Sequence, residues 1–140
     1  MSFPRSLALA FEKALASVDL ADRVHDALPA VPPVAGRVRV LAVGKAAPRM
    51  LAGALARWGP RIDRALVVVP DGTPVRFDER RVELLRAAHP LPDARSVVAG
   101  EQALGFARGG SGNDILLALV SGGASSLVCS SVGGGVILLW

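Results

Sequence analysis

Three short segments of the sequence combine small residues with side chains that can do chemistry. The first is Gly44-Lys45-Ala46, in which a glycine and a lysine directly follow an apolar run. It is not a Walker A loop, because the upstream glycine spacing and the following Ser or Thr are missing, and the Gly-x-Gly-x-x-Gly dinucleotide fingerprint is also absent. What remains is a lysine at an expected helix N-terminus, where a cation costs about 0.3–1 kcal/mol unless an anion is present.

The use of lysine in this chain is selective. Of the 16 basic residues only Lys13 and Lys45 are lysines, and the others are arginines. A lysine at a strand end supplies a compact, flexible charge that suits a phosphate group. The competing interpretation is a solvated lysine that swings clear of the helix dipole. Position alone does not separate these two interpretations.

The second segment is a loop of serines and glycines that follows an apolar run. Two glycines let an anion approach the backbone closely, the N–H groups at a helix start point toward it, and serine hydroxyls can add donors. This pattern favours phosphate or carboxylate binding over a plain strand–helix turn. An esterase elbow needs Gly-x-Ser-x-Gly, and Leu127 stands where the last glycine should be, so acyl transfer is disfavoured. The residues of this loop are Ser121, Gly122, Gly123, Ala124, Ser125 and Ser126.

The third segment is His89-Pro90-Leu91-Pro92-Asp93. A triad of Ser125, His89 and Asp93 can be imagined, but its chain order is not that of the α/β hydrolases. The favoured interpretation is structural: the prolines stiffen a loop, Asp93 caps the next helix, and His89 satisfies backbone groups. His89 and Asp93 are also too few to form a metal site by themselves.

The elements that position these segments alternate along the chain. Apolar runs predict strands, and apolar residues at helical spacing predict one or two helices near the N-terminus and two more between strands. Such alternation predicts an α/β domain with a Rossmann-like parallel sheet and flanking helices, incomplete in this chain. In these sheets ligands bind beyond the carboxyl ends of the strands, where all three segments fall. The expected strands are 38–43, 65–69, 82–87 and 115–120, and the expected helices lie in 5–28, 45–58 and 93–108. The turn Pro70-Asp71-Gly72 is expected to close the second strand, and Val97, Gly100, Leu104 and Ala107 are expected to face inward from the last helix.

Composition limits the classes of function. The chain has 140 residues, of which 51% are hydrophobic, and a formal net charge of +4. Nucleic-acid binding is disfavoured because the arginines are dispersed and only 4% of residues are aromatic. The single cysteine, Cys129, permits neither an internal disulfide nor a thiolate zinc site. Without a signal peptide or an apolar run approaching ~18 residues, we expect a cytoplasmic protein that does not span a membrane.

Together the three segments, in their order, resemble the N-terminal domain of the bacterial glycerate 2-kinases. The resemblance is carried by Val-Leu-Ala-Val-Gly-Lys-Ala-Ala-Pro-Arg-Met from Val40, by His-Pro-Leu-Pro-Asp from His89, and by Val-Ser-Gly-Gly-Ala-Ser-Ser-Leu from Val120. Members of that family pair this domain with a smaller C-terminal MOFRL domain. The likeness extends to about Leu127 and covers well under half of a complete family member.

The resemblance implies ATP-dependent phosphorylation of the 2-hydroxyl of D-glycerate, with Mg²⁺ as the partner of ATP. Lys45 would then stabilise the transferred phosphoryl group or orient the substrate, and the loop from Ser121 to Ser126 would hold phosphate or carboxylate. Gly44 would belong to the cofactor-binding loop, and His89 and Asp93 would contact substrate. Relatives often carry the name hydroxypyruvate reductase, although no nicotinamide fingerprint supports a reductase here.

The end of the chain departs from the expected family pattern. We interpret residues 1–127 as the N-terminal part of the glycerate-kinase-like domain and 128–140 as a divergent tail from a truncated or frameshifted reading frame. This predicts a fragment that is inactive alone and has an apolar end that favours self-association unless it pairs as a strand. The alternatives are a stand-alone module that binds a phosphorylated or carboxylated metabolite, and a reductase.

Overall fold

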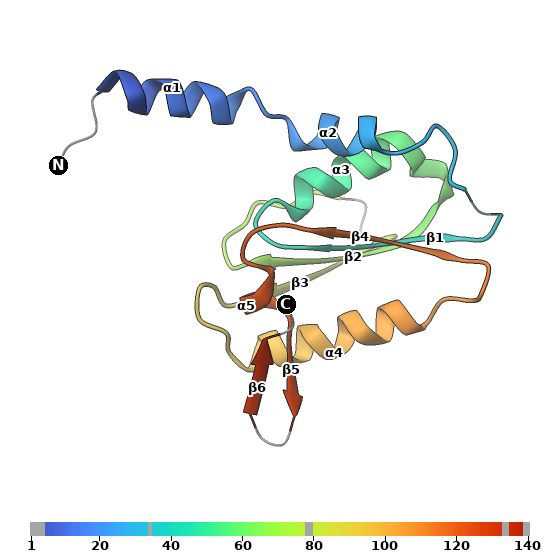
Figure 1. The fold of residues 1–140 in the computed structure, drawn as a ribbon. Coiled ribbons are helices and arrows are strands. Elements are labelled where there is room, and N and C mark those ends of the chain that lie inside the picture. Colours follow the sequence, from blue (N-terminus) through green and yellow to red (C-terminus); the bar gives the residue numbers. More distant parts are fainter. Residues whose placement is uncertain (1–4, 34, 78–79, 133–134, 139–140) are drawn as a thin grey trace.

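A computed structural model describes residues 5–33, 35–77, 80–132 and 135–138 of the chain. Figure 1 shows a central sheet with helices on both sides and a small hairpin near the C-terminus. The elements in chain order are α1 (Arg5–Ala16), α2 (Leu20–Ala27), β1 (Val38–Val43), α3 (Ala47–Trp58), the 3₁₀ turn η1 (Gly59–Arg61), β2 (Ile62–Pro70), β3 (Val82–Ala87), α4 (Ala94–Arg108), β4 (Ile115–Val120), α5 (Ala124–Leu127), β5 (Cys129–Val132) and β6 (Gly135–Leu138).

The main sheet is parallel and has the strand order β3-β2-β1-β4. The chain builds outward from β1 through β2 to β3 and then returns to place β4 on the other side of β1. The prediction of a parallel α/β sheet is therefore confirmed, with β2 longer at both ends than the sequence pattern indicated. Because the order reverses between β1 and β4, the carboxyl ends of these two strands form the topological switch point of the sheet.

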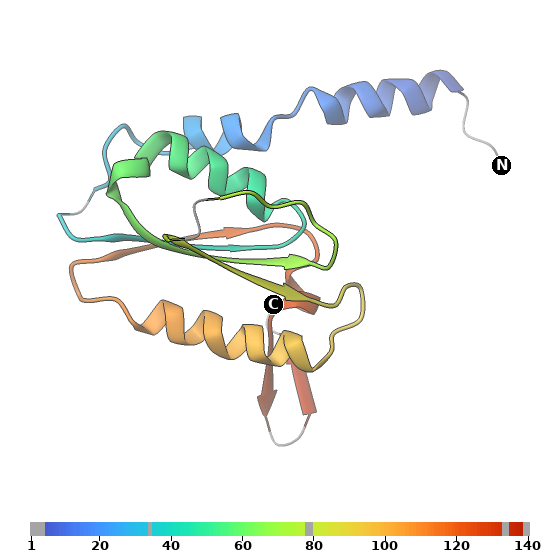
Figure 2. The same cartoon turned by 180° about the vertical axis from the view of Figure 1, so that it is seen from behind.

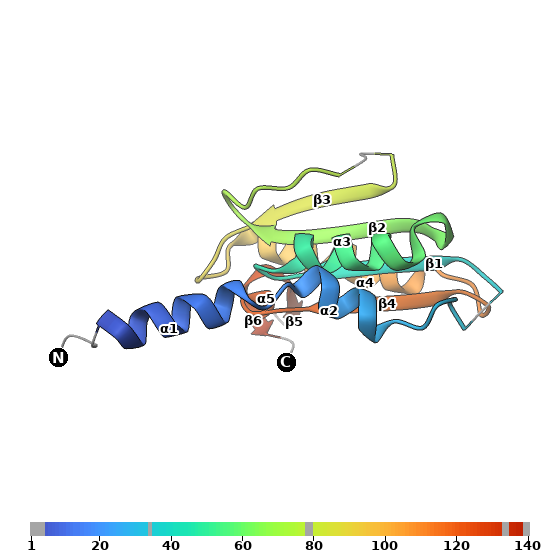
Figure 3. The ribbon, with the colours of Figure 1, turned by 90° about the horizontal axis from the view of Figure 1, so that it is seen from above.

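Helices cover both faces of this sheet, as Figures 2 and 3 show. On one face, α3 buries Leu51, Ala54 and Trp58 against alternate residues of β1 and β2, with α2 packed on its outer side. Pro48 lies in the first turn of α3, where its missing N–H group leaves no hydrogen bond unmade. On the other face, α4 packs against a second core cluster that includes Leu66, Val68 and Leu127.

Helix α4 begins where the sequence predicted it, but only part of its predicted inward face is buried. Gly100 is buried as predicted, whereas the side chain of Leu104 is 37% exposed. The buried positions are Ser96, Ala99, Gly100 and Ala103. These are small residues, and a Cβ atom on Gly100 would lie 1.9 Å from the carbonyl oxygen of Cys129 in β5. The helix therefore turns its smallest residues toward its neighbours because the backbone of β5 approaches it so closely.

The two ends of the chain lie outside the two core clusters. Helix α1 extends away from the sheet in Figures 1 and 3, and its apolar side chains Leu7 and Phe11 are exposed. At the other end β5 and β6 pair as an antiparallel hairpin beside α4. Residues 135–138, from the predicted apolar end, thus pair as a strand, whereas residues 133, 134, 139 and 140 lie outside the described part of the chain. Whether 128–140 forms a divergent tail stays a prediction.

No helix in the described segments combines the length and apolar character needed to cross a membrane.

Candidate functional site

The Gly44-Lys45 loop and the serine–glycine loop lie side by side at the switch point of the sheet. The first follows β1 and the second follows β4, and these strands are paired in register from Val38 with Ile115 to Val43 with Val120. Figure 1 shows α3 on one face of the sheet and α5 on the other, at the same end of these strands. This parallel pairing places both loops at the same edge of the sheet, as the sequence predicted.

Backbone and side-chain hydrogen bonds join the two loops. The N–H group of Lys45 donates to the carbonyl oxygen of Gly122 over 3.0 Å, and the N–H group of Ala46 donates to Oγ of Ser121 over 3.1 Å. The N–H group of Ser121 donates in turn to the carbonyl oxygen of Val43 over 2.9 Å. These bonds fix the position of Lys45 relative to the serine–glycine loop.

Gly44 makes this close approach of the loops possible. Its φ is 122°, in the region that side chains rarely adopt. A Cβ atom at this position would also lie 2.2 Å from Oγ of Ser121. The backbone conformation and the closeness of Ser121 therefore both require glycine at this position. Gly44 lets the two loops approach because it has no side chain.

Gly123 is the point on which two of the predicted functional side chains converge. Its φ is 91°, and a Cβ atom placed on it would lie 2.8 Å from Cδ2 and 2.9 Å from Nε2 of His89. The same Cβ atom would lie 3.7 Å from Cε of Lys45. The loops after β1, β3 and β4 thus bring Lys45, His89 and Gly123 together, although they are far apart in the sequence.

Several polar groups at this point have no partner within the described residues. The side chain of Lys45 is exposed, and neither it nor the half-buried ring of His89 makes a recorded hydrogen bond or ion pair in this part of the chain. The sequence analysis expected the His89 ring to hydrogen-bond backbone groups, but no such hydrogen bond is recorded in the described segments. The N–H groups of Gly122 and Gly123 likewise donate to no recorded acceptor there. A cation, an imidazole and two amide donors can therefore meet a ligand.

The serine hydroxyls divide into structural and accessible groups. Oγ of Ser121 accepts from Ala46, and Oγ of the buried Ser126 donates to the carbonyl oxygen of Gly123 over 2.9 Å. These two hydroxyls shape the loop. Ser125 is half-buried, and its hydroxyl has no recorded partner among the described residues, so it is the serine best placed to donate to a ligand.

Asp93 takes the structural role that the sequence favoured. It is the N-cap of α4: its carboxylate accepts from the N–H group of Arg95 over 2.9 Å, and its own N–H group donates to Oγ of Ser96 over 3.2 Å. This capping box satisfies donors at the helix start that would otherwise have no partner. The carboxylate of Asp93 is therefore committed to α4 rather than free to contact a ligand.

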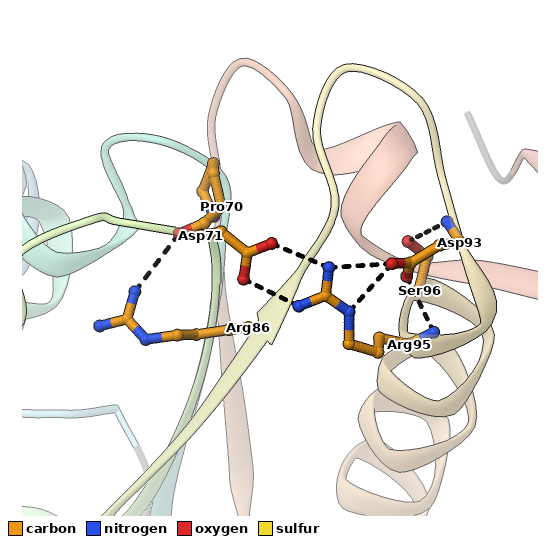
Figure 4. A network of polar contacts seen from close by, with 6 residues as sticks. All are labelled: Pro70, Asp71, Arg86, Asp93, Arg95 and Ser96. Carbon is orange, nitrogen blue, oxygen red and sulfur yellow. Dashed lines mark hydrogen bonds and ion pairs between the residues drawn. The ribbon is translucent and has the colours of Figure 1, made fainter.

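Arg95 ties the cap to the turn after β2, as the close-up in Figure 4 shows. Its guanidinium donates to both carboxylate oxygens of Asp71 over 2.9 and 2.8 Å, and its Nε donates to Asp93 over 2.9 Å. These hydrogen bonds from Arg95 hold the pKa values of the Asp71 and Asp93 carboxyl groups below their usual range. The loop that carries His89 is thus anchored at its far end, where it enters α4.

A second arginine anchors the near end of the same region. The guanidinium of Arg86, near the end of β3, donates to the carbonyl oxygen of Pro70 over 3.4 Å (Figure 4). It also donates to the carbonyl oxygen of Thr73 over 2.9 Å. The sequence identified the Pro70-Asp71-Gly72 turn but gave no sign that Arg86 and Arg95 would hold it, because these pairings join residues from different strand ends. The peptide bond between His89 and Pro90 is cis.

None of the described residues form a group of three or more His, Cys, Asp or Glu side chains able to hold a metal ion. Cys129 is buried, and burial raises the pKa of its thiol.

The known proteins that this chain resembles are longer than it is. The sequence model of the family described as "Domain of unknown function (DUF4147)" matches residues 6–138. A protein of Agrobacterium vitis that carries the name hydroxypyruvate reductase is 39% identical over 127 residues, which is 88% of this chain and 27% of that protein. The D-glycerate 2-kinase of Thermotoga maritima is 37% identical over 92 residues, or 65% of this chain and 22% of the relative.

The fold also matches a solved structure. The crystal structure of glycerate kinase from Thermotoga maritima superposes with a TM-score of 0.76 at 33% sequence identity, covering 94% of this chain and 32% of that one. The chain thus spans about a third of that structure and 27% of the Agrobacterium vitis protein. The resemblance predicted from the three loops is confirmed, and the chain belongs to the DUF4147 family, the N-terminal domain of the glycerate 2-kinase family.

Proposed function

We propose that this chain supplies the anion-binding loops of an ATP-dependent glycerate 2-kinase, which transfers a phosphoryl group from ATP to the 2-hydroxyl of D-glycerate. The observation that carries the proposal is the convergence of Lys45 and His89 on Gly123 at the switch point of the sheet. The kinase names of the Thermotoga maritima and Pyrococcus horikoshii relatives support the choice of reaction.

The residues present fit a phosphate or carboxylate group. Gly123 leaves a hollow that a Cβ atom would fill, bordered by the cation of Lys45 and the ring of His89. Lysine with backbone N–H groups is a combination that binds phosphate in many proteins. ATP, when bound, supplies the phosphoryl group, and Mg²⁺ accompanies it with phosphate and water oxygens as its main ligands.

Lys45 would act by charge and position. Phosphoryl transfer depends mainly on alignment and on stabilisation of charge that spreads over the transferred oxygens, rather than on covalent chemistry with the protein. A mobile ammonium group next to fixed amide donors can follow that charge as it moves. His89 and the hydroxyl of Ser125 are placed to hydrogen-bond the substrate. The glycine-rich backbone then excludes side chains from the space that the reacting groups occupy.

We also propose that the chain alone binds these ligands without turning them over. It covers 32% of the Thermotoga maritima glycerate kinase structure, so the other 68% of that relative has no counterpart in the given sequence (100 − 32). Correct alignment of two substrates needs groups on both sides of them, and misplacement of about 1 Å costs on the order of 100-fold in rate. The predicted state is therefore a half-site.

The test is calorimetric titration of the purified chain with ATP·Mg²⁺ and, separately, with D-glycerate. We expect saturable binding that Lys45→Ala abolishes and that Lys13→Ala preserves. Lys13 is the matched control because it removes the same charge from the exposed helix α1. Binding that survives Lys45→Ala would refute the assignment of Lys45, and steady turnover of D-glycerate by the wild-type chain would refute the half-site.

The name of the Agrobacterium vitis relative gives a second candidate, reduction of hydroxypyruvate. A reductase would bind NADH or NADPH, and the sequence has no Gly-x-Gly-x-x-Gly loop for either. Mixing the chain with hydroxypyruvate and each nicotinamide in turn decides the matter. Loss of the absorbance of the reduced nicotinamide would favour the reductase over the kinase.

A further inference from the structure

Strand β4 forms one edge of the main sheet and lacks the features that usually protect an edge. The strand order ends with β4, which pairs with β1 alone among the described strands. Its sequence, Ile-Leu-Leu-Ala-Leu-Val, contains no charge and no proline, and its register with β1 continues without a bulge. The opposite edge strand, β3, carries Glu83 and Arg86. Because charges, prolines and bulges discourage pairing, β4 is the edge suited to accept a further strand.

Three backbone N–H groups of β4 face the uncovered side. The N–H groups of Ile115 and of Ser121, just after the strand, donate to carbonyl oxygens on the β1 side. Backbone N–H groups point alternately to the two sides of a strand, so those of the even-numbered positions between them point away from β1. No strand in the described part of the chain lies there to accept them. These positions are Leu116, Ala118 and Val120.

The side chains of the same three residues form an exposed apolar surface, here called the β4 stripe. Successive side chains of a strand project to opposite faces, and the odd-numbered residues of β4 pack into the core beneath α3. The β4 stripe therefore lies on the other face, which α4 covers over β1, β2 and β3. Leu116 is 39% exposed and Val120 is 63% exposed. The apolar face of the sheet thus continues beyond the part that α4 covers.

The connections already present determine the face on which a further unit would lie. From β1 the chain passes through α3 to β2, and from β3 it passes back through α4 to β4. These two crossovers run in opposite directions along the sheet and place their helices on opposite faces (Figures 1 and 2). Crossovers between parallel strands share the right hand. A crossover from β4 to a strand beyond it runs in the same direction as the second one, so its helix lies on the face of α4 and of the β4 stripe.

The segment that follows β4 supports this choice of face. Leu127, at the end of α5, is buried in the core cluster on the α4 side of the sheet, and Val128 packs against the same cluster. The chain therefore leaves β4 toward the face that carries the exposed stripe. The Thermotoga maritima glycerate kinase structure, of which this chain covers 32%, has further chain that can supply the missing helix and strand.

We propose that the uncovered edge and the stripe of β4 form the surface on which the rest of a glycerate 2-kinase family member docks. The docking part adds a parallel strand to β4 and packs the apolar face of a helix on the stripe. This inference rests on the half-site proposed above and specifies where its two parts meet. It does not depend on which ligand the loops at the carboxyl ends of the strands bind.

The first test co-expresses the tagged chain with the part of the Thermotoga maritima kinase that it does not cover. Sedimentation of the purified product, without nucleotide, should show a one-to-one complex. Leu116→Glu should lower the recovery of this complex about tenfold or more, because it places a carboxylate without a partner in an apolar interface. Leu84→Glu is the matched control, since Leu84 is 37% exposed on the opposite edge strand and its substitution should leave the complex intact.

Two results of this experiment would overturn the proposal. One is the absence of a complex with the wild-type chain. The other is an equal loss of the complex in Leu116→Glu and Leu84→Glu, which would place the contact elsewhere. A thermal melt of each variant accompanies the series. Because the side chain of Leu116 is exposed in the chain alone, Leu116→Glu should melt close to the wild type.

Amide hydrogen exchange tests the added strand without any substitution. In the chain alone, the N–H groups of Leu116, Ala118 and Val120 should exchange faster than those of Ile115 and Leu117, which face β1. In the complex the first three should slow about tenfold or more, because a new strand accepts their hydrogen bonds. A complex in which these three amides exchange as fast as in the chain alone would overturn the proposal.

Self-association is a separate outcome of the same measurements. A wild-type chain that sediments as a dimer, with slow exchange at the three amides and dissociation by Leu116→Glu, would assign the surface to a second copy and overturn the proposal. None of these measurements uses ATP or D-glycerate. Docking can therefore fail while ATP·Mg²⁺ still binds in a manner that requires Lys45, and failure of that binding leaves the docking result unchanged.

Discussion

Basic side chains are partnered differently at the two ends of the parallel sheet. At the carboxyl end, arginines are used structurally: Arg49 pairs with Asp19, Arg95 with Asp71 and Asp93, and Arg86 with carbonyl oxygens. Lys45 is the basic side chain of this end that the described residues leave unpaired. At the amino end Arg37 pairs with Asp63, whereas Arg39 and Arg64 are register partners that make no recorded ion pair within the described residues.

This difference shows which charges are available to a ligand. A basic residue held by carboxylates has already exchanged water for a partner and contributes mainly to the position of a loop. A basic residue beside glycines has both its charge and the adjoining backbone donors open to an anion. The carboxyl end therefore combines glycine-shaped loops with one exposed lysine, whereas the amino end carries guanidinium groups of which only some have partners among the described residues.

The largest expected effect comes from the glycine that joins the two loops at the carboxyl end. Gly44→Ala should destabilise the fold by about 3 kcal/mol or more, because the left-handed backbone and the contact with Ser121 both oppose a side chain. Gly72→Ala is the control: its φ is 75° but no atom lies within 4 Å of the added Cβ, so about 1 kcal/mol is expected. Urea unfolding of both variants measures the difference, and equal losses would contradict the close approach of the loops.

The next effect tests whether α4, which connects the two ends, is held in place by β5. Gly100→Ala should cost about 1–3 kcal/mol, because the new methyl group meets the carbonyl oxygen of Cys129. Gly105→Ala in the same helix has open space and should instead stabilise by about 0.5–1 kcal/mol. If both substitutions stabilise the chain in a denaturant titration, the hairpin does not pack on α4 as described.

The smallest effect concerns the paired arginines of the carboxyl end. Arg95→Gln should raise the pKa values of the Asp71 and Asp93 carboxyl groups toward the ordinary value of about 3.9, since hydrogen bonds from Arg95 are the largest cause of their lowering. The sign follows from proton binding: the stabilisation is present above about pH 4 and is lost as pH falls through the lowered pKa values. Carbon-detected NMR titration follows each carboxyl group, and unchanged pKa values in the variant would show that Arg95 does not hold them.

Much of the arrangement could be predicted from periodicity and from glycine. The four strands, the cap at Asp93 and the common edge of the three loops follow from local patterns, because buried strands and helix caps have local sequence signatures. The role of Gly44 as the contact surface for Ser121 could not be predicted, since it depends on register between strands 77 positions apart (121 − 44). The position of the Arg39 guanidinium over Phe106 could not be predicted either, because the residues around Arg39 in the sequence are those of an ordinary alternating strand.

The buried stripe of α4 shows the limit of helical periodicity. Helical spacing placed Leu104 on the inward face together with Gly100, yet the helix packs through Gly100 and its neighbours Ala99 and Ala103 while Leu104 is exposed. Apolar size predicts burial only where space is available, and here the approach of β5 leaves space for small residues alone. A rule based on hydrophobicity cannot detect a neighbour that the chain supplies about 30 positions later.

The most direct test of the account is a backbone amide NMR titration of the isotope-labelled chain with ATP·Mg²⁺. The account predicts saturable shifts at Lys45, Gly122 and Gly123, with the ring of His89 following the same curve, and loss of these shifts in Lys45→Ala. Shifts confined to the arginine-lined amino end, or shifts at Gly122 and Gly123 that persist in Lys45→Ala, would contradict the central claim that the glycine-shaped end with its single mobile lysine binds the nucleotide.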